Sequence, residues 1–217
     1  MIEAVVFDMD GILFDTERLV SECWNEVAVK MQIKDLDAIL KACIGLNKKA
    51  TRALFLEKLG HAFDFNQFDK MAHDAFINKV KREGLPIKTG VYELLDYLKQ
   101  VGFKIGLASS TSVAGVRSHL KEAKIEDYFQ VIVGGDMVTN GKPDPEIYLR
   151  ACRELGVVSE NAIAIEDSHN GIRAAHAAGM KTVMVPDLMP LTEEIEPLLY
   201  QNMESLLKVR DFFENLQ

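Results

Sequence analysis

Short apolar runs alternate along this chain with longer amphipathic segments, and each run stops at polar or turn-forming residues. The runs lie at Ala4–Phe7, Lys104–Ala108, Val131–Val133, Ala162–Ile165 and Thr182–Val185. Short apolar runs of this kind are typical of strands that are buried on both faces of a parallel sheet. Helical periodicity lies between them, as at Val91–Val101 before Gly102 and at Asn170–Ala178 before Gly179. This alternation predicts an α/β fold with a doubly wound parallel sheet of five strands.

One stretch, residues 16–83, departs from this alternation because it has amphipathic helical patterns and no convincing strand. The patterns cover Glu17–Met31, Lys48–Leu59 and Phe65–Lys81. Gly84 marks the return to the strand-and-helix rhythm, since glycine commonly ends a helix. We therefore predict two domains: a catalytic core made of residues 1–15 and 84–217, and an inserted all-helical cap made of residues 16–83.

The charge, the cysteine content and the lengths of the apolar runs limit the partners and the cellular compartment that we expect. The 217 residues include 33 acidic and 25 basic side chains, for a net charge of −8, which argues against a nucleic-acid partner. The three cysteines are scattered and odd in number, so we expect no disulfide framework and a reducing compartment. No signal peptide and no apolar run near the ~20 residues needed to span a bilayer is visible. We expect a cytoplasmic protein without a membrane partner.

Carboxylates follow two of the predicted strands. Asp8 and Asp10 come directly after the first strand, with Gly11 permitting a sharp turn, and Glu166 and Asp167 end the fourth. Because ligands bind beyond the carboxyl ends of the strands in such sheets, these acids are expected to meet in one crevice. Gathered carboxylates repel each other unless a cation lies among them, and oxygen ligands suit Mg²⁺. A polar turn without a metal is the simpler alternative for the first pair alone.

Three further residues could hold the oxygens of a phosphate. Ser109 and Ser110 end the second strand and offer a hydroxyl and backbone N–H groups, and Lys142 supplies a cation in the loop after the Val131 strand. Charge-assisted hydrogen bonds from such groups neutralise the oxygens of a phosphoryl group. Together with the carboxylates, these residues predict phosphoryl transfer, where positioning and charge neutralisation supply most of the catalysis.

These segments resemble the haloacid dehalogenase superfamily, in the branch that contains β-phosphoglucomutase and small-molecule phosphatases. Its first motif matches Asp8–Leu13, its second Ser109, its third Lys142 before Pro143, and its fourth Glu166–Ser168. The four motifs occur in order over nearly the whole chain. The resemblance implies a Rossmann-like core, with a helical cap where the insertion lies. It also implies a cis peptide bond between Lys142 and Pro143.

The resemblance also implies a mechanism. Asp8 attacks phosphorus to form an aspartyl-phosphate, and Asp10 first protonates the leaving oxygen and then activates the acceptor. Ser109 and Lys142 bind the transferring phosphoryl group. The implied ligands of Mg²⁺ are the Asp8 carboxylate, the Asp10 backbone carbonyl, Asp167, and Glu166 either directly or through water.

Four residues of the insertion are candidates for contact with the substrate. Thr16 and Glu17 lie at the junction with the core, where capping of a helix is an equally good explanation. Asn47 and Lys48 lie in a cap loop where relatives carry specificity residues, and simple surface exposure is the alternative for Lys48. The four histidines other than His169 lack metal-ligand spacing, and His169 is expected at the rim.

The leading functional hypothesis is a phosphatase that hydrolyses a small phosphorylated metabolite, in particular a sugar phosphate, as a monomer. The alternative is β-phosphoglucomutase, which returns the phosphoryl group to a sugar. Such mutases carry a His four residues after the position of Thr16 and an Arg in the cap loop, where this chain has Val20 and Lys48. A phosphate-sensing receiver domain would be shorter and would lack the insertion. Dehalogenases and phosphonatases lack the second acid, here Asp10.

Overall fold

The computed structural model describes residues 1–33, 36–43 and 48–215. The chain divides into two compact units. One consists of Met1–Asp15 and Leu85–Gln217, and the other of Thr16–Gly84. We call the first the core unit and the second the cap unit. None of the helices in the described part of the chain combines the length and the apolar character that crossing a bilayer would require.

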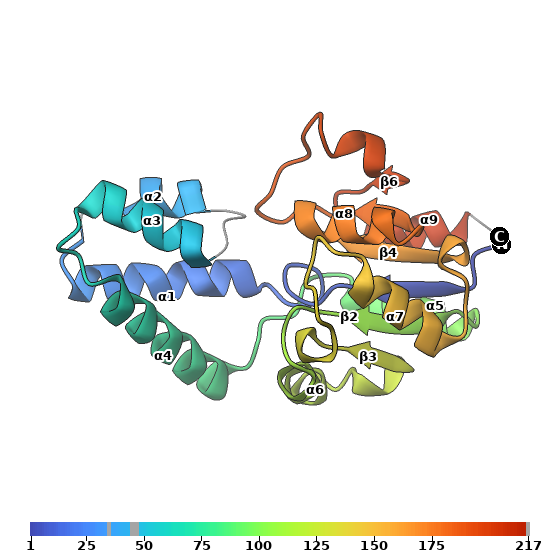
Figure 1. The fold of residues 1–217 in the computed structure, drawn as a ribbon. Helices are drawn as coiled ribbons and strands as arrows, with labels where there is room; N and C mark the ends of the chain where they lie inside the picture. Colours follow the sequence, from blue (N-terminus) through green and yellow to red (C-terminus); the bar gives the residue numbers. More distant parts are fainter. Residues whose placement is uncertain (34–35, 44–47, 216–217) are drawn as a thin grey trace. The chain divides into compact units, whose positions relative to one another are not determined.

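A parallel sheet forms the centre of the core unit (Figure 1). Its strands are β1 (Ala4–Phe7), β2 (Lys104–Ala108), β3 (Val131–Val133), β4 (Ala162–Glu166), β5 (Lys181–Met184) and β6 (Gln201–Asn202). Their order across the sheet is β3-β2-β1-β4-β5-β6, and every neighbouring pair is parallel. The order reverses at β1, which lies between β2 and β4. The chain therefore leaves β1 and β4 toward opposite sides of the sheet, and in open parallel sheets such a point is where ligands bind beyond the carboxyl ends of the strands.

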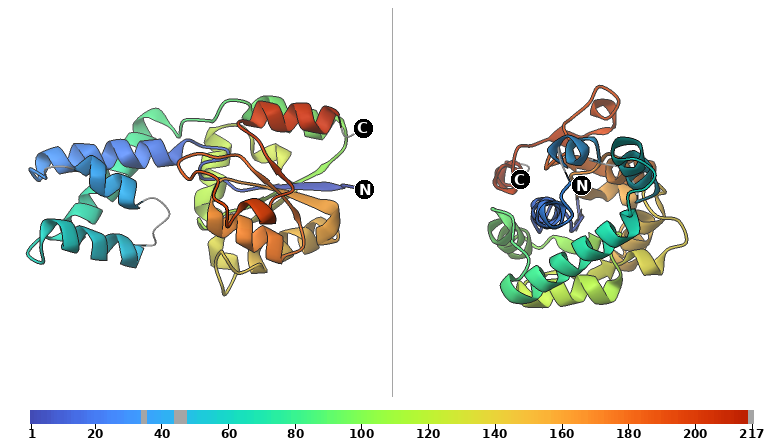
Figure 2. Two further views of the ribbon diagram at one scale, coloured as in Figure 1. Left: turned by 90° about the horizontal axis from the view of Figure 1, so that it is seen from above. Right: turned by 90° about the vertical axis from the view of Figure 1, so that its left-hand side faces the viewer.

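Helices cover both faces of this sheet (Figure 2). Larger side chains such as Val5 and Phe7 pack against α5 (Val91–Gln100), α6 (Val113–Glu122) and α9 (Leu206–Glu214). Smaller alternate side chains such as Ala4 and Val6 pack against α7 (Glu146–Leu155) and α8 (His169–Ala177). Because successive strand residues point to opposite faces, the alternation of large and small side chains gives the two faces of the sheet separate cores of different composition. Short 3₁₀ helices occupy Glu126–Tyr128, Gly135–Met137, Ser159–Asn161 and Glu196–Leu198.

Serine residues start three of the core helices. The hydroxyl oxygens of Ser112, Ser168 and Ser205 accept hydrogen bonds from backbone N–H groups three residues further on, at the starts of α6, α8 and α9. Such caps satisfy N–H groups that the first helical turn leaves without a partner. The α8 cap matters for function because it fixes the backbone that directly follows Glu166 and Asp167.

The cap unit consists of α1 (Thr16–Lys30), α2 (Leu36–Cys43), α3 (Lys48–Leu59) and α4 (Phe65–Glu83). Its centre is an aromatic cluster around Phe55, whose ring lies 4.9 Å from that of Phe68 and 5.5 Å from that of Trp24. Asp64 caps α4 by accepting from the N–H of Gln67 at 3.0 Å. Burial of this aromatic surface, rather than helix propensity, is what holds four short helices together.

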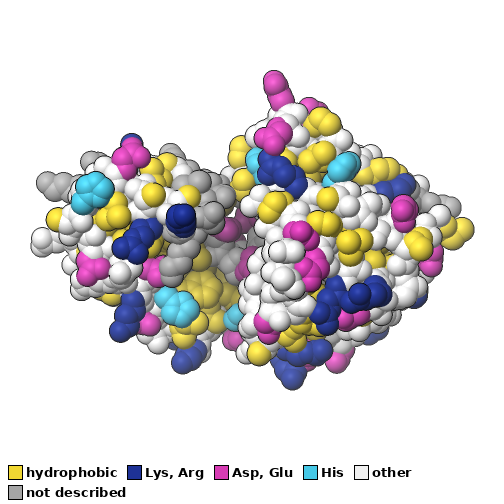
Figure 3. Space-filling view, in the orientation of Figure 1, with side chains coloured by type: hydrophobic (Ala, Val, Ile, Leu, Met, Phe, Trp, Pro, Cys, Tyr) yellow, Lys and Arg dark blue, Asp and Glu magenta, His cyan; other side chains and the backbone are white. Residues whose placement is uncertain are grey.

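The structure confirms the predicted fold class and adds elements that the sequence pattern did not show. A sixth strand, β6, has two exposed residues and therefore no apolar run. The helices α2, α6, α7 and α9 were not assigned, and β5 begins one residue earlier than predicted. Charged side chains of both signs are scattered over the visible face of each unit, without a purely basic area (Figure 3).

Candidate active site

The three central strands bring the predicted residues to one edge of the sheet. The Asp8 N–H donates to the Ile165 carbonyl at 2.9 Å, so the end of β1 is locked beside the end of β4. On the other side, Ser109 follows β2 and its N–H donates to the Val133 carbonyl at 3.0 Å. Asp8, Ser109 and Glu166 therefore occupy adjacent strand ends, and all three are buried.

Lys142 joins the ends of these strands. Its ammonium donates to Asp8 Oδ1 at 2.5 Å, to Glu166 Oε1 at 2.6 Å and to the Ala108 carbonyl at 3.1 Å. The side chain is only 7% exposed, and an ammonium has three protons, so each proton has an acceptor. The loop that carries Lys142 includes a cis bond to Pro143, as the resemblance implied. The cation is thus fixed directly against the candidate nucleophile.

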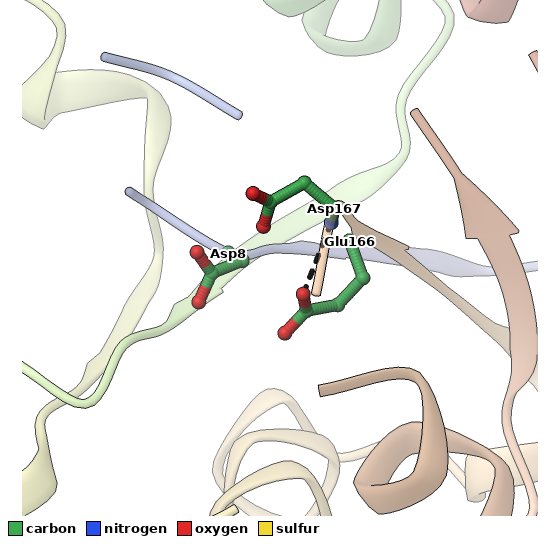
Figure 4. A group of neighbouring side chains, drawn as sticks. All are labelled: Asp8, Glu166 and Asp167. Carbon is green, nitrogen blue, oxygen red and sulfur yellow. Dashed lines mark hydrogen bonds between the residues drawn. The ribbon is translucent and has the colours of Figure 1, made fainter. Parts of the chain in front are cut away.

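Glu166 is completely buried, and both of its oxygens accept hydrogen bonds, of which Figure 4 draws the one from Asp167. Oε1 accepts from Lys142 and from the Tyr148 hydroxyl at 2.8 Å. Oε2 accepts from the Asp167 N–H at 3.0 Å, the Ser168 N–H at 3.1 Å and the Ser168 hydroxyl at 3.0 Å. Five donors meet the roughly four lone-pair sites of a carboxylate, so Glu166 is saturated by protein groups.

Asp10 and the serines lie around a turn after β2 that also contains Thr111. The Thr111 hydroxyl donates to Asp10 Oδ2 at 3.3 Å, and the Thr111 N–H donates to Ser109 Oγ at 3.1 Å. Ser110 is exposed. Sequence reasoning missed Thr111, although its position two residues after Ser109 in a run of hydroxyl residues was a signal. It also missed Tyr148, which lies six residues after Lys142 on α7.

Gly11 and Gly171 make room for two of the carboxylates. Gly11 has φ +80°, and a Cβ placed there would lie 2.2 Å from Asp167 Oδ2. A Cβ on Gly171 would lie 1.7 Å from Glu166 Oε1. No larger residue fits either position without moving the neighbouring carboxylate, and Gly11 also adopts a backbone conformation that favours glycine. The crowding shows that both acids are held in place by close packing.

Burial and charge shift the pKa values of the central groups in opposite ways. Burial raises the pKa of Asp8 to about 8, against the attraction of Lys142, which lowers it, while Glu166 and Asp10 raise it further. Burial also acts to lower the pKa of Lys142, but Asp8 and Glu166 outweigh it and hold that pKa well above its usual value. Additional positive charge at this place would favour ionised Asp8.

The carboxylates are arranged as an oxygen-rich group that fits a hard divalent cation. Among the described residues, Asp8, Glu166 and Asp167 each offer an oxygen within 4.8 Å of the others, and all three are buried (Figure 4). An all-oxygen set with few protein ligands is the donor chemistry that Mg²⁺ accepts. Because Glu166 is already saturated by donors, Asp8 and Asp167 are the better candidates for direct contact.

The candidate substrate residues of the insertion belong to the cap unit. Thr16 begins α1 and is buried, and its hydroxyl oxygen has no hydrogen-bond partner. Glu17 is the next residue of α1 and is exposed. Asn47 lies outside the described residues, and so does the side chain of Lys48, whose backbone begins α3. His169, expected at the rim, places Nε2 2.9 Å from the Pro190 carbonyl.

An aspartate, a buried lysine and an acidic pair thus lie together at the carboxyl edge of a parallel sheet. The sequence pattern of the haloacid dehalogenase-like hydrolases matches residues 5–185. The chain therefore belongs to the haloacid dehalogenase-like hydrolases, as the motifs predicted.

Proteins similar in sequence to this chain include a phosphatase and a mutase. A phosphorylated carbohydrates phosphatase from Thermotoga maritima is 36% identical over 83% of this chain and 83% of its own length. A β-phosphoglucomutase from Bacillus subtilis is 32% identical over 87% of this chain and 85% of its own. A crystal structure of CbbY from Rhodobacter sphaeroides in complex with phosphate aligns with a TM-score of 0.72 at 27% identity, covering 96% of each chain.

Proposed function

We propose that this protein is a Mg²⁺-dependent phosphatase that hydrolyses a small phosphorylated metabolite, specifically a sugar phosphate, through an aspartyl-phosphate on Asp8. The observation that carries the proposal is the contact of 2.5 Å between Asp8 Oδ1 and Lys142 Nζ at the end of the central strand. A buried carboxylate held against a buried ammonium is suited to receive a phosphoryl group, since the ammonium can stabilise the charge that develops on its oxygens.

In the first step, an Asp8 oxygen forms a bond to phosphorus while the bond from phosphorus to the ester oxygen breaks. Asp10 supplies a proton to that oxygen, so that the product leaves as an alcohol. In the second step Asp10 takes a proton from water, the water oxygen bonds to phosphorus, and the acyl-phosphate bond breaks to restore Asp8. The Thr111 hydroxyl, which donates to Asp10 Oδ2, orients this carboxyl group for both transfers.

Mg²⁺ would be held by the Asp8 carboxylate, the Asp10 backbone carbonyl and Asp167, while Glu166, whose oxygens already accept five hydrogen bonds, would contribute its negative charge close to the ion. When bound, the ion supplies positive charge that offsets repulsion between the nucleophile and the anionic substrate. Gly11 maintains the short separation between the β1 loop and Asp167 on which this ligand set depends.

The remaining oxygens of the phosphoryl group would contact Ser109, Ser110 and Lys142. Ser109 Oγ accepts from the Thr111 N–H, so its own hydroxyl proton stays available to donate. Ser110 contributes its backbone N–H. These donors would be fixed before substrate arrives, and fixed donors stabilise a transition state without the cost of reorganising during the reaction.

The relatives and the cap unit support a phosphorylated sugar as substrate and water as acceptor. The Thermotoga maritima relative is named for phosphorylated carbohydrates. We propose Thr16, Glu17, Asn47 and Lys48 as the cap residues that contact the sugar. Val20 lines a pocket of about 280 Å³ between α1 and α4 of the cap unit, and its apolar side chain cannot hydrogen-bond a sugar. Hydrolysis is favoured over the mutase alternative because Val20 and Lys48 replace the His and Arg of such mutases.

A screen of phosphorylated metabolites tests this function. Free phosphate is measured after incubation of the protein with sugar phosphates, nucleotides and phosphorylated acids, each with Mg²⁺ and with a chelator instead. We expect the highest kcat/KM with a sugar phosphate and loss of turnover on chelation. Absence of phosphate release from every member of the panel would overturn the proposal, and turnover that survives chelation would remove its metal requirement.

A further inference from the structure

Tyr148 contacts both members of the charged pair behind the nucleophile. Its hydroxyl donates to Glu166 Oε1 at 2.8 Å, and Lys142 Nζ lies 4.9 Å from the centre of its ring. Tyr148 is fully buried on α7. A buried tyrosine hydroxyl without a hydrogen-bond partner costs free energy. The contact with Glu166 is therefore strongly favoured over arrangements that break it.

Glu166 cannot easily move away from that geometry. Its second oxygen is held by two backbone N–H groups and the Ser168 hydroxyl. On the side of α8, Gly171 leaves no space, because even a Cβ there would lie 1.7 Å from Oε1. Glu166 is therefore a fixed acceptor, and the position of Lys142 depends on how strongly Oε1 attracts its ammonium.

Two donors share Oε1: the Lys142 ammonium at 2.6 Å and the Tyr148 hydroxyl at 2.8 Å. The hydroxyl takes up part of the acceptor strength of this oxygen. Without it, Lys142 would be the only donor on Oε1, and its bond to Glu166 would strengthen at the expense of its bond to Asp8. In a site with little water, this competition is strong because the effective dielectric is low.

We propose that Tyr148 is a positioning residue, which acts through Glu166 to hold the Lys142 ammonium against Asp8 so that it can bind a phosphoryl oxygen there. The Tyr148 hydroxyl donates to Glu166 and not to Asp8, so its effect on Asp8 passes through Lys142. The kinetic part of this inference rests on the proposed phosphatase function, whereas the phosphate-binding part does not.

The variant Tyr148→Phe removes the hydroxyl and keeps the ring. Tyr128→Phe is the control, because the hydroxyl of the half-buried Tyr128 also donates to a carboxylate, Asp96 Oδ1 at 2.5 Å. Tyr128 precedes β3 and so lies at the amino ends of the parallel strands, opposite the catalytic edge. Affinity for inorganic phosphate is measured by calorimetry with Mg²⁺ present, and kcat and KM are measured with an aryl phosphate. We expect Tyr148→Phe to weaken phosphate binding and to lower kcat/KM about tenfold each, as for loss of a hydrogen bond to a charged group.

The control should change both quantities less than twofold. Circular dichroism and thermal unfolding establish that both variants are folded. If Tyr148→Phe stays within twofold of the wild type in phosphate affinity and in kcat/KM, the positioning role is overturned. An equal loss in Tyr128→Phe would overturn it too, because the effect would then come from general loosening of the core unit.

A second measurement reports Lys142 itself. In protein labelled with ¹⁵N-lysine, we expect the NMR signal of the buried Lys142 Nζ to shift in Tyr148→Phe and to stay unchanged in Tyr128→Phe. A signal that is unchanged in both variants contradicts the proposal. Both this signal and phosphate affinity are independent of turnover. If the wild type hydrolyses no phosphomonoester, the proposed function fails, and these two readouts still decide the role of Tyr148.

Discussion

The candidate site of the core unit is built around a buried charged group, and the interior of the cap unit is built around a buried aromatic one. Glu166 is completely buried and accepts hydrogen bonds from five donors, while Phe55 is completely buried among four other aromatic rings. Both groups are buried, but polar donors surround the first and apolar rings surround the second. Hydrogen bonds to a buried charge are directional, whereas contacts between aromatic side chains tolerate small shifts.

This difference assigns separate tasks to the two units. A reaction centre needs groups fixed to within a fraction of an ångström, and a saturated polar network provides that. An apolar bundle of four short helices provides a surface whose residues can vary without disturbing the chemistry. Substitutions in the core network should therefore act on turnover, and substitutions in the aromatic cluster should act on the stability of the cap unit and on substrate choice.

The largest effect is expected from Asp8→Asn. An amide is a poor nucleophile and a poor Mg²⁺ ligand, so kcat should fall by about 10⁴-fold or more while the fold is kept. Phosphate release and circular dichroism are the measurements. Asp127→Asn, which removes an exposed carboxylate of the same unit, serves as the control and should leave kcat unchanged. Full activity in a folded Asp8→Asn protein would remove Asp8 from its proposed role.

Asp10→Asn should lower kcat by about 10²- to 10⁴-fold for an alkyl phosphate, the usual contribution of a general acid–base group. The loss in the first step should be smaller for an aryl phosphate, because its leaving oxygen hardly needs a proton. Single-turnover rates with substrates of increasing leaving-group pKa give this comparison. Equal losses for aryl and alkyl substrates would argue against Asp10 as the acid.

Phe55→Ala tests the role of the aromatic cluster in the cap unit. Removal of this buried ring should destabilise the cap unit by about 3–5 kcal/mol, the usual cost of a large cavity in an apolar core. Phe55→Leu, which fills part of the cavity, should cost less. Hydrogen exchange should rise across residues 16–84, with little change in β1, β2 and β4. Loss of protection spread evenly over both units would show that their stabilities are not separable.

The smallest effect is expected from Lys79→Met. Lys79 forms ion pairs with Glu22 at 2.6 Å and Glu26 at 3.7 Å, whose carboxylates are exposed, in contrast to the buried pairs of Lys142. Because Glu22 is 38% exposed, solvent screens the pair, and its loss should cost about 1 kcal/mol or less. Lys81→Met, on the exposed side of the same helix, gives the reference. A loss comparable to that of Phe55→Ala would show that ion pairing holds the cap unit together.

The strand ends were predictable from sequence because their chemistry follows directly from the topology. The carboxyl ends of parallel strands share one edge of the sheet, so Asp8, Ser109 and Glu166 were expected to meet there. Backbone hydrogen bonds from Asp8 to Ile165 and from Ser109 to Val133 confirm that these strands are neighbours in the sheet. Strand β6 escaped prediction because its two residues are exposed and carry no hydrophobic signal.

Tyr148 and Thr111 were not assigned roles from sequence, for a different reason. Both act through contacts with residues that are distant along the chain, Glu166 and Asp10 respectively. A tyrosine in an amphipathic helix is normally a core residue, and a threonine in a Ser/Thr run is normally a turn residue. Only the three-dimensional structure shows that each hydroxyl donates to a carboxylate of the site.

The acceptor of the phosphoryl group tests the central claim most directly, since the account requires water rather than a sugar. The protein is incubated with β-glucose 1-phosphate, Mg²⁺ and a trace of glucose 1,6-bisphosphate, and both products are followed over time, with Asp8→Asn as the inactive control. Net hydrolysis predicts that inorganic phosphate accumulates without dependence on the bisphosphate. Faster accumulation of glucose 6-phosphate than of inorganic phosphate would contradict the account and establish a mutase.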